Sequence, residues 1–142
     1  MGDSEQAGIV DQLQEVIDAV LVCRGFATGQ AGATEGRREI VWCAAADDFA
    51  ARFPELPASQ EPADGWGTMC TDVVVDLTSV GGQWRLSEVS VEGEPLDRLL
   101  AGLDLSASAG RAAALIGATA EDSLALVPPL LIELLDDAGP RR

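Results

Sequence analysis

The sequence contains no histidine, lysine or tyrosine, and all nine of its basic residues are arginine. These absences exclude, within this chain, a Ser-His-Asp triad, a Walker lysine, a Schiff-base lysine and histidine-based metal sites. Asp, Glu, Cys, Ser and Arg therefore remain as the side chains available for catalysis. Two carboxylates in different environments can perform acid–base chemistry, but no spacing in the sequence requires such a pair.

The three cysteines, Cys23, Cys43 and Cys70, are widely spaced and form no Cys-x-x-Cys pair. A zinc site needs closer spacing or histidine partners, and a disulfide framework needs an even number of cysteines. We therefore predict that they are small buried hydrophobic residues, and that the protein uses no metal and no other cofactor.

The chain has no long apolar run, and we expect no secretory leader. No apolar segment approaches the roughly 20 residues that span a bilayer, and the acidic start over residues 1–6 is unlike a secretory signal. A length of 142 residues suits one compact domain with a substantial core. We expect a single domain over 1–142, cytoplasmic and without membrane contact.

The net charge of −15, from 24 acidic residues against nine arginines, is the strongest compositional feature. Such a charge repels the phosphates of nucleic acids, so we expect no nucleic-acid partner. It favours a basic protein partner. Solubility alone is the competing explanation, because net charge governs association and solubility rather than fold.

A hairpin at 71–92 is the central structural prediction. Alternating valines and polar residues over 71–78 predict a half-buried strand, Gly81-Gly82 predicts a tight turn, and 83–91 predicts the partner strand. Regular pairing places Glu88 among valines, whereas a β-bulge near Ser87 returns Val89 and Val91 to the apolar face. We favour the bulge, and the alternative is that Glu88 is a buried functional acid.

The remaining pattern predicts an α+β fold with a small antiparallel sheet of about three strands. An amphipathic helix over 9–21 and a helical C-terminal third would cover the sheet, and 39–44 would supply its third strand. A short helix is expected over 48–52, ending before Pro54. Pro128-Pro129 predicts a break in the last helical segment.

Two segments are expected to be loops. The Pro/Gly-rich loop at 54–69 is long enough to be functional, and the Gly-rich loop at 25–36 is most simply a flexible connection. The alternative for the second loop is an anion site, in which backbone amides act together with Arg24, Arg37 and Arg38.

These features favour a non-enzymatic, acidic protein-binding domain of the inhibitor, immunity-type or small chaperone-like kind, which captures a basic protein partner. The predicted contact residues lie on the long loop and its approach: Asp47, Asp48, Glu55, Glu61, Asp64 and Trp66. The alternative is a small-molecule-binding protein or enzyme with a pocket between sheet and helices, built from Glu88, Asp72, Asp76 and Arg85. A homodimer formed through the sheet face or the leucine-rich helices is a third possibility.

Overall fold

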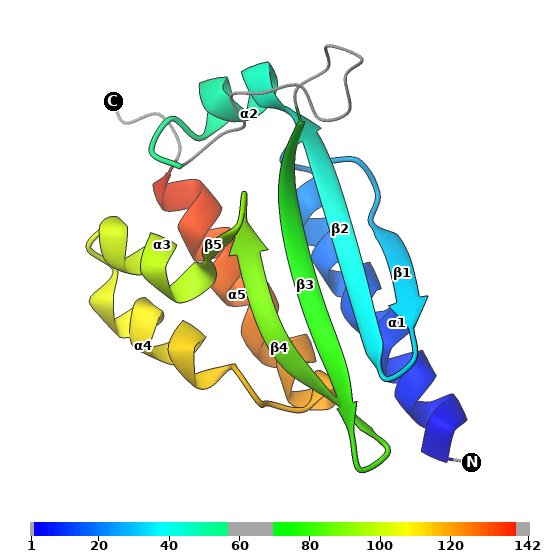
Figure 1. The fold of residues 1–142 in the computed structure, drawn as a ribbon. Helices are drawn as coiled ribbons and strands as arrows, with labels where there is room; N and C mark the ends of the chain where they lie inside the picture. The colour runs from blue at the N-terminus through cyan, green and yellow to red at the C-terminus, as the bar shows by residue number, and fades with distance from the viewer. Residues whose placement is uncertain (1, 57–69, 139–142) are drawn as a thin grey trace.

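The computed structural model describes residues 2–56 and 70–138. In chain order the elements are α1 (Gly2–Val22), β1 (Gln30–Thr34), β2 (Arg37–Ala45), α2 (Ala46–Arg52), β3 (Cys70–Val80), β4 (Gln83–Val91), β5 (Glu94–Pro95), α3 (Leu96–Gly102), α4 (Ser106–Ala114) and α5 (Ala120–Asp137) (Figure 1). None of these helices is both long and apolar enough to cross a membrane.

The fold is α+β, as the sequence predicts, and its sheet is antiparallel with the order β1-β2-β3-β4-β5. The two edge strands extend the expected three-stranded sheet to five strands. β1 lies inside the Gly-rich segment 25–36, so the prediction that this whole segment is a loop is wrong. Residues 30–34 have little strand propensity, and they are extended because β2 offers a complete pairing partner, from Gln30↔Val41 to Thr34↔Arg37.

The predicted β-bulge is confirmed in the central hairpin. Leu77 pairs with Leu86 and Asp76 pairs with Glu88, so Ser87 is the extra residue on β4. After the bulge, Val89 and Val91 face the core and are buried, whereas Glu88 is only partly buried. One inserted residue thus keeps the carboxylate out of the apolar layer.

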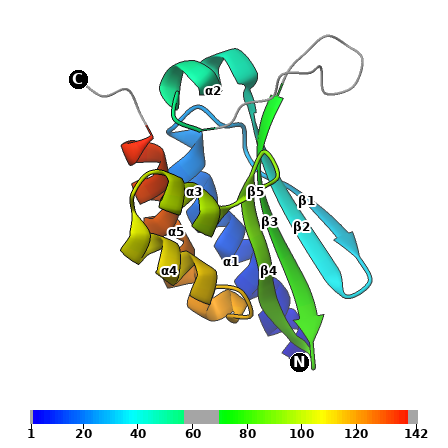
Figure 2. The same ribbon diagram turned by 60° about the vertical axis from the view of Figure 1, so that its left-hand side comes forward.

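Helices α1 and α5 pack against each other and cover one face of the sheet (Figure 2). Both helices contribute fully buried aliphatic side chains to this layer, among them Leu13, Ile17 and Leu21 of α1 and Leu131 and Leu134 of α5. Burial of each such side chain contributes about 1.5–3 kcal/mol, which makes this layer the main source of stability. We call the covered side of the sheet the inner face and the opposite side the outer face.

The break expected at Pro128-Pro129 is wrong, because α5 continues through both prolines. Val127 and Leu130, which flank them, are buried in the core, while Pro129 is exposed. Burying apolar side chains on both sides of the prolines offsets the cost of the missing backbone donors. By contrast, α2 ends before Pro54 as predicted.

Candidate binding face on the uncovered side of the sheet

The outer face of the sheet is not covered by any described helix, since α1 and α5 lie on the opposite side (Figure 2). Strand alternation determines which residues it presents. Ile40, Trp42 and Ala44 of β2 are buried on the inner face, so Arg37, Glu39, Val41 and Cys43 lie on the outer face. The same alternation applies to β3, and to β4 on each side of the Ser87 bulge.

The pairing register places three carboxylates side by side across β2, β3 and β4. Glu39 pairs with Asp76, and Asp76 pairs with Glu88, so the three form one row, which we call the acidic row. Carboxylates directly opposite each other on a sheet repel and cost stability, by a few tenths to about 1 kcal/mol per pair. A cationic side chain beside the row offsets that cost.

Asp76, in the middle of the acidic row, is only 8% exposed. Its Oδ1 atom has no hydrogen-bond partner among the described residues. The guanidinium of Arg37 lies 3.4 Å from this oxygen, which is an ion pair without hydrogen-bond geometry. Most of the Arg37 side chain is exposed, so solvent screens this ion pair, and the buried oxygen accepts no hydrogen bond.

A shallow hollow of about 280 Å³ opens beside the acidic row and is lined by Gly32, Thr34, Arg37 and Glu39. It lies over β1 and β2 on the outer face. Gly32 has no side chain to fill it, and a Cβ atom at this position would find its nearest neighbour, the Glu39 backbone oxygen, 3.9 Å away. The carboxylate of Glu39 is therefore accessible from the β1 side.

The other candidate acids on this face are already engaged. The Cys43 Sγ donates to Asp72 Oδ1 at 3.1 Å, and the Asp72 backbone N–H donates to Glu92 Oε1 at 3.2 Å. Arg85 donates to the Gly117 carbonyl oxygen at 2.7 Å and therefore points along the sheet edge. Asp72, Asp76, Glu88 and Arg85 thus share the outer face of the sheet.

Glu88 does line a separate pocket of about 210 Å³ between β4, α3 and α4. Its other walls include Leu86, Leu96 and Leu115, and Asp97 is the second acid there. Within residues 2–56 and 70–138, no group of three or more Cys, Asp or Glu side chains is arranged to hold a metal ion. The small-molecule alternative at Glu88 stays a prediction.

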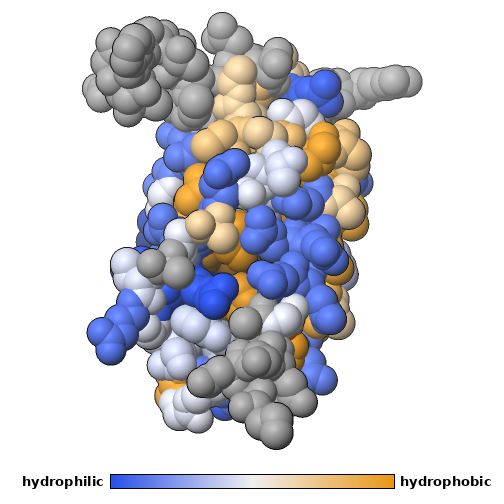
Figure 3. Space-filling view, turned by 90° about the vertical axis from the view of Figure 1, so that its right-hand side faces the viewer, coloured by the Kyte–Doolittle hydropathy of each residue, from blue (hydrophilic) through white to orange (hydrophobic). Residues whose placement is uncertain are grey.

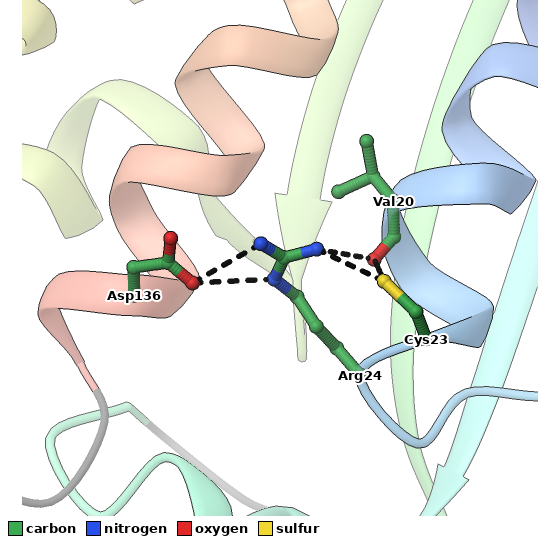
Figure 4. Close-up of polar contacts among 4 residues, drawn as sticks. All are labelled: Val20, Cys23, Arg24 and Asp136. Carbon is green, nitrogen blue, oxygen red and sulfur yellow. Dashed lines mark hydrogen bonds and ion pairs between the residues drawn. The ribbon is translucent and has the colours of Figure 1, made fainter.

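The structure does not bring the three arginines of the anion-site alternative together. Arg37 points to the outer face, whereas Arg38 lies on the inner side, with its guanidinium 5.3 Å from the centre of the Trp84 ring. Arg24 is at the far end of α1, where it donates to Asp136 Oδ1 at 3.2 Å (Figure 4). Each arginine therefore has its own intramolecular role.

Cys23 is exposed and Cys43 is half-buried, so the prediction of buried cysteines is wrong for Cys23. Cys23 follows the last turn of α1, where its Sγ donates to the Val20 carbonyl oxygen at 3.2 Å. Arg24 contacts both of these groups (Figure 4). The position after the helix end, rather than hydrophobicity, determines the exposure of this thiol.

The loop residues predicted to bind a partner are only partly described. Glu55 is exposed, and Asp47 and Asp48 lie in the first turn of α2. Glu61, Asp64 and Trp66 lie outside the described residues. Sequence reasoning missed Glu39, although its alternation with Ile40 and Trp42 was a usable signal for the outer face.

Comparison of the chain with protein-family models, curated proteins and solved structures finds no match.

Proposed function

We propose that this protein is a non-enzymatic binding protein that holds a basic segment of a protein partner on the outer face of its sheet. The observation that carries the proposal is Asp76 Oδ1, a buried acceptor without a hydrogen bond at the centre of a row of three carboxylates. An arginine or lysine side chain of the partner would supply the missing donor and neutralise the row. No described helix covers the row, and its outer member Glu39 is exposed, so a partner side chain reaches Asp76 by displacing the exposed Arg37 side chain.

The distribution of charge supports the same proposal. Most described arginines already contact groups of this chain: Arg24, Arg37, Arg38, Arg85, Arg98 and Arg111. The acidic residues exceed the arginines by a net charge of −15, which produces a negative field around the molecule. Such a field attracts a basic partner and speeds its association.

Neutralising the outer two members of the row should slow association with the partner. We expect Glu39→Gln/Glu88→Gln to lower the association rate constant about tenfold at low salt and to flatten its dependence on salt. The measurement is binding kinetics over a range of salt concentrations, with a basic protein captured from cell extract at low salt. The double variant should remain folded and gain a few tenths of a kcal/mol, because repulsion within the row is relieved.

The matched control is Asp11→Asn/Glu15→Gln, which removes the same two charges from exposed positions on α1. This helix covers the inner face, so its outward side is remote from the acidic row. If both double variants slow association equally, net charge alone attracts the partner and the acidic row is not the site. If no basic protein binds the wild type at low salt, the proposal fails.

A further inference from the structure

The sheet has one open edge among the described residues, and it is β1. The opposite edge is closed, because β4 pairs with β5 at one end and with residues 117–119 at the other. There the Leu86 N–H donates to the Ala118 carbonyl oxygen at 2.8 Å, and the Gly117 N–H donates to the Leu86 carbonyl oxygen at 2.8 Å. β1 pairs with β2 alone, so every second backbone N–H and C=O group of β1 points away from the sheet.

Edge strands usually carry a charged side chain, a proline or a bulge that prevents another strand from pairing. The sequence of β1, Gln-Ala-Gly-Ala-Thr, has neither a charge nor a proline, and its pairing with β2 runs without a register shift. Hydrophilic groups cover a large part of this side of the molecule, with smaller hydrophobic patches between them (Figure 3). β1 is therefore suited to accept an additional strand.

The position of Gly32 connects this edge to the acidic row. Gly32 pairs with Glu39, and both residues line the hollow beside the edge strand. On a strand added beside β1, the side chain facing Gly32 would lie about 10 Å from the Glu39 backbone, which is two strand spacings. An arginine or lysine side chain at that point reaches over Gly32 to the Glu39 carboxylate, and a shorter side chain does not.

The net charge of the chain favours a foreign strand over a second copy of this chain as the occupant of the β1 edge. Two copies paired through β1 would each carry a net charge of −15 and would bring Glu35 and Glu39 of both chains to one interface, where Arg37, which lines the same hollow, offsets only part of the acidic charge. Like charges at that distance oppose the pairing. A basic segment is complementary to Glu35, Glu39 and the net charge of the chain.

We infer that the free edge of β1 accepts an extended, arginine- or lysine-containing segment of the partner as an additional antiparallel or parallel strand. The inference rests on the proposed function and specifies its mode: backbone pairing at β1 and a cationic side chain across Gly32 to Glu39. Backbone hydrogen bonds supply part of the affinity, and the cationic side chain supplies selectivity.

A peptide of about ten residues that alternates arginine and threonine tests this mode. A second peptide of the same sequence carries methyl groups on all its amide nitrogens, so it keeps the charge and loses every backbone donor. We expect the first peptide to bind at least about tenfold more tightly, because a few edge hydrogen bonds are lost in the second. Amide exchange measured by NMR should slow at least about tenfold at outward-facing residues of β1.

The variant Gly32→Arg places a guanidinium over Glu39 and should weaken binding of the alternating peptide at least about tenfold. Its matched control is Ala113→Arg, an equal charge change at an exposed position of α4. If both variants weaken binding equally, the hollow at Gly32 plays no part and the inference is wrong.

The peptide pair also separates this inference from the proposed function. Equal binding of both peptides, with unchanged exchange at β1, would overturn strand addition and leave the acidic face as the binding site. Binding of neither peptide would contradict both proposals. Concentration-dependent protection of β1 without any peptide would show that a second copy occupies the edge, and it would overturn the inference.

Discussion

Gly29→Ala is expected to destabilise the protein by about 1–3 kcal/mol, because the added methyl group overpacks a buried site. A Cβ atom at this position would lie 2.6 Å from the indole nitrogen of Trp42, which is fully buried. The indole is held in place, because core residues surround it and its Nε1–H donates to Asp18 Oδ1 at 2.5 Å. Displacing the indole would also disturb this hydrogen bond.

Asp18 joins α1 to the segment that leads into β1. Besides the indole, its carboxylate accepts the Gly29 backbone N–H at 3.0 Å, and the Gln14 side-chain amide donates to the Gly29 carbonyl oxygen at 3.0 Å. Asp18→Ala should therefore also cost about 1–3 kcal/mol, because it leaves the buried indole N–H without an acceptor. Both variants should increase amide exchange in β1, the strand that this contact positions.

Urea unfolding measures these effects, and Gly32→Ala is the matched control. The nearest atom to a Cβ at Gly32 lies 3.9 Å away, so this alanine should be tolerated or slightly stabilising. If Gly29→Ala and Gly32→Ala have the same stability, the close approach of Gly29 to Trp42 is not a packing constraint.

Pro129→Ala is expected to stabilise the protein by about 1–3 kcal/mol, an unusual direction for a substitution within a folded helix. Pro129 lies inside α5 and is exposed, so alanine restores a backbone donor towards the Ala125 carbonyl group without emptying the core. Alanine also relieves the restriction that a proline imposes on the residue before it. Removing the proline ring also raises the conformational entropy of the unfolded chain, which offsets part of the gain in stability.

Thermal and urea unfolding of Pro129→Ala should be compared with those of Pro54→Ala, an exposed proline just after α2. That control removes no proline from a helix, so its stability should stay the same or fall slightly. An unchanged or lowered stability of Pro129→Ala would show that α5 is already adapted to its prolines.

The central hairpin was predictable because its signals are local. Alternation over Val73, Val75 and Leu77 gives the inner face, and the glycine pair gives the turn. Even the bulge followed from the sequence, since it alone returns Val89 and Val91 to the core without burying Glu88. Regular pairing would have buried Glu88 and exposed two valines, and this conflict with the hydrophobic pattern was enough to locate the bulge.

Other features were not predictable because distant contacts determine them. Residues 30–34 are a strand because β2 pairs with them, and α5 continues through Pro128 because buried residues on both sides hold it to the core. Asp76 and Glu88 were identified as candidates from the sequence. Their alignment with Glu39 depends on the pairing of β2 with β3, two strands that lie far apart in the chain.

The most direct test of the account is to locate the bound basic segment on the protein by NMR. Titration of isotopically labelled protein with the basic partner, or with the alternating arginine–threonine peptide, reports which backbone amides change. The account predicts the largest chemical-shift changes in β1, β2 and β3 around Glu39 and Asp76, and it predicts that added salt reverses them. Changes confined to α3, α4 and α5, with the outer face of the sheet unaffected, would contradict it.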